Sequence, residues 1–169
     1  MKANKTILAL VAAGAAAAVT VPVAAASAHS GANRQLAEAR AATAQFHNVD
    51  TARAAGYLPA EHCVEAPGLG AMGFHNPNVG LMDLALDHRT PELLLYAPKN
   101  NGGTRLVAVE YFVPFVGQPA PKLFGQRFDG PMPGHEPGMP THYDLHVWLW
   151  KHNPAGMFAP FNSKVSCTP

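Results

Sequence analysis

The feature that most constrains the fold is residues 104–115, TRLVAVEYFVPF, the longest strand-like segment of the chain. Its β-branched and aromatic residues favour a strand. Successive side chains of a strand point to opposite faces, and both faces are apolar here. Such a strand is typically buried on both sides. We therefore expect a sheet that is covered on both faces around this strand.

Shorter strand signals lie on either side of it. Residues 70–75, 91–97 and 142–151 are predicted strands, and turn-forming residues separate them. Residues 99–103, KNNGG, are predicted to form a hairpin loop. Residues 81–86 are compatible with either a strand or a helix.

The segment before these strands is predicted to be helical. Residues 32–44 are rich in alanine and contain Glu38 and Arg40, which are good helix formers. A short second helix is expected at residues 51–55, with Asp50 as its N-cap. N-terminal helices followed by four or five strands predict an α+β fold built on an antiparallel sheet.

Residues 117–140 form a long segment with no clear helix or strand pattern. They contain six prolines and five glycines. Loops of this length are uncommon in compact domains unless they are functional or disordered. We interpret the segment as a flap across one sheet face. A crossover connection without a role is the alternative.

Residues 1–28 have the pattern of a secretory signal peptide. Lys2 and Lys5 precede an unbroken apolar run, and the small-x-small sequence ASA ends at Ala28. An uncleaved membrane anchor is the alternative. Cleavage after Ala28 leaves residues 29–169 as a single exported domain, secreted or periplasmic, with no membrane attachment.

The expected mature domain has little net charge. The signal peptide holds two of the 12 Lys and Arg residues and none of the 11 Asp and Glu residues. A nucleic-acid partner would need a basic patch, and an anionic membrane surface would need a polybasic cluster. Neither is present, which leaves a small molecule or a peptide as the expected partner.

The chain has two cysteines, Cys63 and Cys167. An even pair in an exported protein predicts a disulfide. It would close the C-terminal coil onto the body through a loop of about 100 residues, which stabilises the fold by up to ~4–5 kcal/mol in the chain-entropy model. Metal thiolates or a redox pair are the alternative, although the C-x-x-C spacing is missing.

The segment HYDLHVWLW, residues 142–150, contains two histidines. His142 and His146 would share a metal ion on a helix. On a strand, however, they are about 13 Å apart and cannot both bind one ion directly. His146, which is flanked by apolar positions, is the better candidate for chemistry.

Glu110 is the second candidate, because it lies in the middle of the apolar segment 104–115. A buried carboxylate is costly unless it is paired, hydrogen-bonded or bound to a metal. His75 is the third. It ends the predicted strand 70–75 at a turn, where its side chain can point back over the sheet.

Together, His75, Glu110 and His146 would form a set of two histidines and one carboxylate. This set suits Zn, Fe(II) or Mn and leaves positions open for water or substrate; Cu is a further possibility. His142 and His135 are additional candidate ligands. In a metal-dependent reaction, Glu110 would be a ligand or a general base. The chain has no G-x-S-x-G elbow and no phosphate-binding glycine loop.

Two alternatives stay open. In a non-catalytic binding module, the same three residues would form a buried hydrogen-bond network. Aromatic side chains would then enclose an apolar ligand or peptide: Tyr111, Phe124, Trp148 and Trp150. Separately, cleavage after Ala28 makes His29 the first residue, whose amine and imidazole can chelate Cu(II).

Four motifs carry a resemblance: MGFHN, VEYFVP, LHVWLWKHNPAGMFAPFN and the final VSC. They resemble a group of small exported bacterial proteins of unassigned function. The resemblance covers nearly all of the mature chain. It implies one family unit and brings no activity, fold or ligand with it.

Overall fold

The computed structural model describes the backbone of residues 23–169, and side-chain burial from residue 30 onward. Most of the predicted signal peptide, and the side chain of His29, therefore lie outside the described part. Helices come first: α1 (Val23–Thr43), the 3₁₀ turn η1 (Ala44–His47) and α2 (Val49–Ala54). Within the described residues, no helix has the length and hydropathy of a membrane span.

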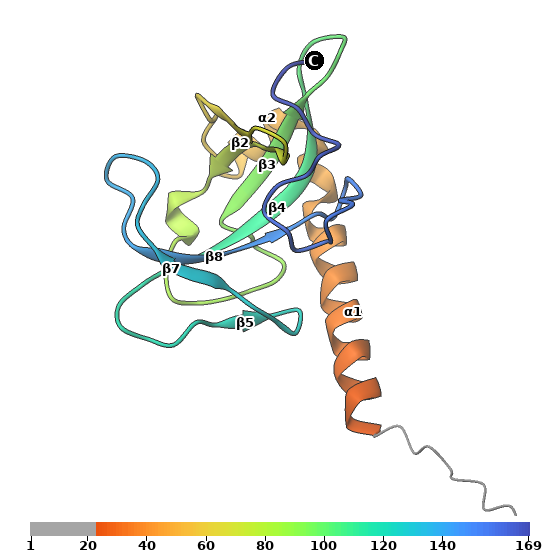
Figure 1. Cartoon of the computed structure of the whole chain (residues 1–169), viewed down its shortest axis with the longest axis vertical. Coiled ribbons are helices and arrows are strands. Elements are labelled where there is room, and N and C mark those ends of the chain that lie inside the picture. The colour runs from red at the N-terminus through yellow and green to blue at the C-terminus, as the bar shows by residue number, and fades with distance from the viewer. Residues whose placement is uncertain (1–22) are drawn as a thin grey trace, which may run out of the picture.

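The remaining chain forms a curled antiparallel sheet (Figure 1). Its six strands are, in spatial order, β1 (Cys63–Ala66), β2 (Gly70–Pro77), β3 (Leu93–Pro98), β4 (Thr104–Pro114), β8 (His142–Val147) and β7 (Asp129–Met132). A separate two-stranded ribbon consists of β5 (Lys122–Leu123) and β6 (Gln126–Arg127), and η2 spans Val79–Leu81. The predicted α+β class is confirmed, and β1 and β7 are sheet strands that the sequence pattern did not indicate.

The sheet is buried on both faces, as the sequence of β4 predicted. One core cluster contains Val109 and Tyr111 of β4, together with Phe46 and Ala52 from the helical part. The other contains Phe112 of β4, and the C-terminal coil contributes to it. The helices thus cover one face, and the C-terminal coil covers part of the other.

The short helix α2 begins differently from the prediction. Asn48, rather than Asp50, is the N-cap, and its side chain accepts hydrogen bonds from the backbone N–H groups of Asp50 and Thr51. Asp50 instead pairs with Arg53 at 3.1 Å. Because Asn and Asp are both good N-caps, the sequence alone favours neither position. Gly56 follows the helix with a φ of +95°.

Residues 117–140 wrap around one edge of the sheet instead of crossing a single face. β7 pairs with β8 as the last strand of the sheet. Phe124 and Phe128 are buried in the core cluster on the helix side. Met139 packs against the opposite cluster. The segment therefore completes the sheet and also covers it.

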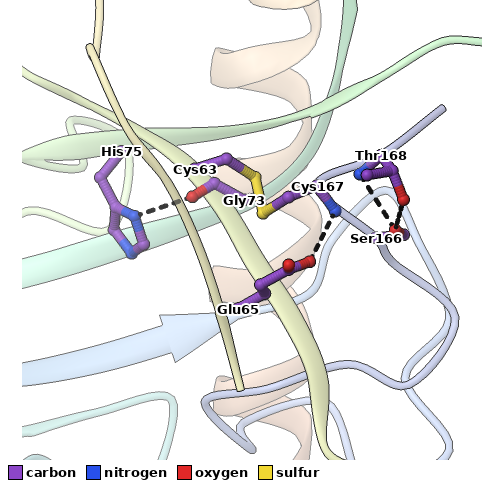
Figure 2. The surroundings of a disulfide bond; sticks show 7 residues. All are labelled: Cys63, Glu65, Gly73, His75, Ser166, Cys167 and Thr168. Carbon is purple, nitrogen blue, oxygen red and sulfur yellow. Dashed lines mark hydrogen bonds between the residues drawn. A yellow bond between two sulfur atoms is a disulfide. The ribbon is translucent and has the colours of Figure 1, made fainter. Parts of the chain in front are cut away.

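The predicted disulfide is confirmed. Cys63 of β1 is bonded to Cys167, with their Cα atoms 5.6 Å apart. The backbone N–H of Cys167 also donates to Glu65 Oε2 at 3.2 Å (Figure 2). Upstream, Asn162 forms an isolated antiparallel bridge with Ala71 of β2. The C-terminal coil is therefore fixed to the β1–β2 edge by a covalent bond and by backbone hydrogen bonds.

We predict that the double substitution Cys63→Ala, Cys167→Ala lowers the free energy of unfolding by about 4 kcal/mol, because the bond constrains a long loop in the unfolded chain. Urea denaturation of the wild type, with and without reductant, checks this. The reduced wild type should match the variant. A loss below about 1 kcal/mol would show that the disulfide constrains the unfolded chain only weakly.

Candidate metal centre

Three side chains converge on the sheet face opposite the helices. His75 Nε2 lies 3.3 Å from Glu110 Oε2, and His146 Nε2 lies 3.6 Å from the same oxygen. One ligand atom from each residue lies within 4.8 Å of the other two. The three residues selected from the sequence are therefore neighbours in the fold.

The register of the sheet explains this convergence. Glu110 and His146 are directly opposed across the β4–β8 pair. His75 is on β2, one strand further away, and is opposed to Leu95 of β3. In a flat sheet, β2 and β4 would be about 9.6 Å apart. The curl of the sheet (Figure 1) and the length of the imidazole close this gap.

The three groups are removed from water to different extents. Glu110 is 5% exposed and His146 is 3% exposed, whereas the side chain of His75 is 19% exposed. Burial raises the pKa of Glu110 well above its usual value, and the carboxyls of Asp144 and Glu92 raise it further. Burial lowers the pKa of His146 to about 3 and the pKa of His75 to about 4. Both imidazoles are therefore neutral near pH 7, which is the state that binds metals.

A backbone carbonyl fixes the orientation of His75. The Nδ1 atom lies 3.2 Å from the oxygen of Gly73, as Figure 2 shows. With its proton on Nδ1, the ring donates to this carbonyl and turns a lone pair on Nε2 toward Glu110. Metal-binding histidines are commonly held in this way.

Gly73 itself cannot be replaced easily. Its φ is +106°, and a Cβ atom at this position would lie 2.4 Å from the backbone oxygen of Tyr96. A side chain here would both clash and require a strained backbone. The glycine thus sets the path of β2 just before His75.

Several buried polar atoms of this cluster have no hydrogen-bond partner among the described residues. They are Glu110 Oε2 and both ring nitrogens of His146. A buried polar atom left unpaired costs about 1–3 kcal/mol. Two of these three atoms, Glu110 Oε2 and His146 Nε2, point at each other and at His75. The described residues therefore bring these polar atoms together without supplying hydrogen-bond partners for them.

A cavity of about 670 Å³ opens beside the three residues, which line part of its wall. Its volume is within the usual range for small-molecule sites. The rest of the wall includes the apolar residues Val64, Met72, Leu93, Met132, Met139 and Phe161. A metal ion bound by the cluster would be accessible to a ligand in this cavity.

The other candidate ligands line the same cavity outside the cluster. His142 is buried, its Nδ1 lies 2.9 Å from the oxygen of Pro140, and its ring stacks on Phe112. His135 is exposed, and its ring lies 5.3 Å from that of His142. The structure places neither imidazole in the three-residue ligand group.

The four aromatic residues proposed to enclose a ligand do not line this cavity. Tyr111 and Phe124 belong to the core on the helix side. Tyr111 is adjacent to Glu110 in β4 and therefore points to the opposite face. Trp148 is buried in the other cluster. Trp150 packs against Arg40 of α1, because β8 ends at Val147 and its alternation stops there.

One buried acid in the cavity wall, Asp144, was not selected from the sequence. It is 5% exposed, lies two residues from His146 and is opposed to Asp129 of β7. Burial raises the pKa of Asp144 to about 7, and the charge of Asp129 adds to the rise. The alternation in HYDLHV places Asp144 and His146 on one face. The sequence did not indicate that Asp129 lies beside Asp144, because β7 is in a proline- and glycine-rich segment without a strand pattern.

Comparisons with protein-family models, with curated proteins and with solved structures found no significant match to this chain. The resemblance drawn from the four sequence motifs therefore stays a prediction. The candidate site is therefore supported by the structure and not by any relative.

Glu92 offers a test of the electrostatics behind the site. It is 2% exposed, and its Oε2 accepts a hydrogen bond from the backbone N–H of Phe112 at 3.1 Å. Burial raises its pKa from 4.5 to about 7. The unfolded chain loses this proton near pH 4.5 and the folded chain near pH 7. The contribution of Glu92 to stability is therefore complete below pH 4.5 and is lost as the pH rises to about 7.

We predict that Glu92→Gln removes this loss while keeping the hydrogen bond to Phe112. The free energy of unfolding of the variant, relative to the wild type, should rise by up to about 3 kcal/mol between pH 4.5 and 7.5. Urea denaturation across this range measures the difference. A difference that does not change with pH would contradict the raised pKa.

Proposed function

We propose that this protein binds one divalent metal ion through His75 Nε2, Glu110 Oε2 and His146 Nε2. The observation that carries the proposal is the convergence of these three atoms, two of which are buried and have no hydrogen-bond partner among the described residues. Zn, Fe, Mn and Cu all accept this donor set.

The spacing of the atoms supports the proposal. Ligands bound tetrahedrally at about 2.0–2.1 Å from zinc lie about 3.3–3.4 Å from one another. The two separations from Glu110 Oε2 are 3.3 and 3.6 Å. Small side-chain adjustments would therefore suffice to close the ring of ligands around an ion.

The electrostatics also support a cation. The three ligands together carry one negative charge when Glu110 is ionised, and both imidazoles are neutral near pH 7. A divalent ion would stabilise the buried carboxylate, whose pKa is raised in the metal-free protein. Three protein ligands also leave a coordination position for water or for a ligand from the cavity, as in catalytic rather than structural sites.

We further propose that the domain functions outside the cytosol, secreted or periplasmic. The Cys63–Cys167 disulfide supports this, because such bonds persist in oxidising compartments. The predicted signal peptide supports it independently.

A second candidate is a structural Glu–His pair without metal. The raised pKa of Glu110 favours it, because a protonated Glu110 can donate to His75 Nε2 at 3.3 Å. Both nitrogens of His146 would remain unpaired in that arrangement. The two candidates differ in their response to metal.

The metal content of the exported, untagged protein tests the proposal. We expect near-stoichiometric metal in the wild type, and less than a tenth of it in Glu110→Gln and His146→Ala, because each removes one of three ligands. Metal removal should also lower the melting temperature. Mass spectrometry of the purified protein measures the first, and thermal denaturation with a chelator measures the second.

Two matched variants serve as controls. Glu92→Gln changes a buried carboxyl outside the cavity, and His47→Gln changes an imidazole that packs on Trp150. Both should retain the metal. A His29→Ala background removes the possible N-terminal copper site. Metal retained by all ligand variants in that background, or no metal in the wild type, would refute the site.

A further inference from the structure

The cavity next to the candidate metal centre has an uneven distribution of charge. Four carboxylates line it: Glu61, Asp129, Glu136 and Asp144. Glu110 adds a fifth. Among the described residues that line it, none is Lys or Arg. Five histidines also line it: His62, His75, His135, His142 and His146. Burial lowers the pKa of His75, His142 and His146, which disfavours their positive charge. An anionic ligand would therefore meet mainly like charges in this wall.

Asp144 lies deepest among the four. It is 5% exposed and lines the cavity. Its carboxylate has no hydrogen bond and no ion pair within residues 30–169, whereas the comparably buried Glu92 accepts a bond from Phe112. A buried carboxylate is normally paired. The side chain that faces Asp144 across the β7–β8 pair is another acid, Asp129, and like charges opposed in this way destabilise a sheet.

We propose that the cavity binds a small organic cation, an amine with an apolar body, whose ammonium group pairs with Asp144 and Asp129. The apolar body would contact Met72, Met132 and Phe161, which line the cavity. Methionine side chains adapt to ligands of irregular shape. A neutral apolar ligand would leave Asp144 unpaired, and an anion would be repelled.

This inference does not require the metal ion, and it is compatible with one. A divalent ion carries two positive charges, whereas Glu110, Asp144 and Asp129 together carry three negative charges when ionised. The cavity wall therefore remains acidic when the proposed centre is filled. Asp144 is two residues from His146 on one strand, about 6.6 Å along it. A bound amine would therefore lie beside the metal centre rather than far from it.

Benzylamine is a suitable probe, with benzyl alcohol and benzoate as neutral and anionic controls of the same shape. Calorimetry in phosphate buffer, free of other amines, measures the three affinities. We expect benzylamine to bind with a dissociation constant of about 1 mM or lower, which is reasonable for a ligand of this size. The two controls should bind at least about tenfold more weakly. Equal binding of the three probes, or no binding of benzylamine, would overturn the proposal.

Variants separate this proposal from direct coordination of the amine to the metal. Asp144→Asn should weaken benzylamine binding by about tenfold or more while the metal content stays unchanged. Glu110→Gln should lose the metal and keep the amine. The reverse pattern, with binding lost in Glu110→Gln and kept in Asp144→Asn, would assign the amine to the metal ion and overturn the role of Asp144.

A third variant keeps the proposal testable if Asp144→Asn does not fold. Asp129 is exposed on the edge strand β7, so Asp129→Asn should fold normally. It should weaken benzylamine binding, although less than Asp144→Asn does. If Asp144→Asn does not fold, unchanged affinity in Asp129→Asn would overturn the proposal.

Discussion

The burial of Glu110 in the middle of β4 is the constraint on which the rest of the site depends. The strand is apolar on both sides, and the carboxylate is 5% exposed. Within residues 30–169, no lysine or arginine pairs with it. Instead, His146 on the neighbouring strand β8 is directly opposite Glu110, and His75 approaches it from β2. All three share one cavity wall, so the group that is most expensive to bury is also placed where a ligand can reach it.

The surrounding structure maintains this arrangement. The helices cover the other sheet face, which leaves the Glu110 face free for the cavity. The C-terminal coil closes the β1–β2 edge through Cys63–Cys167, next to the strand that carries His75 (Figure 2). Residues 117–140 close the opposite edge and bring Asp129 beside Asp144. Each edge of the sheet is thus stabilised by a segment, the C-terminal coil or residues 117–140, that shows no strand pattern in the sequence.

The sequence predicted the parts of the site that depend on local pattern. An acid within an apolar strand and a histidine in each of two other strands identified Glu110, His75 and His146. The approach of His75 to Glu110 depends on sheet curl, which has no local signature. The bulge at Val107 also has no local sequence signal. It lies between the register pairs Tyr96–Leu106 and Leu95–Ala108. β8 ends at Val147, earlier than its composition suggests, so Trp150 lies beyond the strand and packs against Arg40 of α1.

The position of a bound ion is the most direct test of the central claim. Crystals of the zinc-loaded protein, measured on both sides of the zinc absorption edge, would locate it by anomalous scattering. The account predicts one strong peak about 2.0–2.2 Å from His75 Nε2, Glu110 Oε2 and His146 Nε2. A strong peak elsewhere, with these three atoms unliganded, would contradict it.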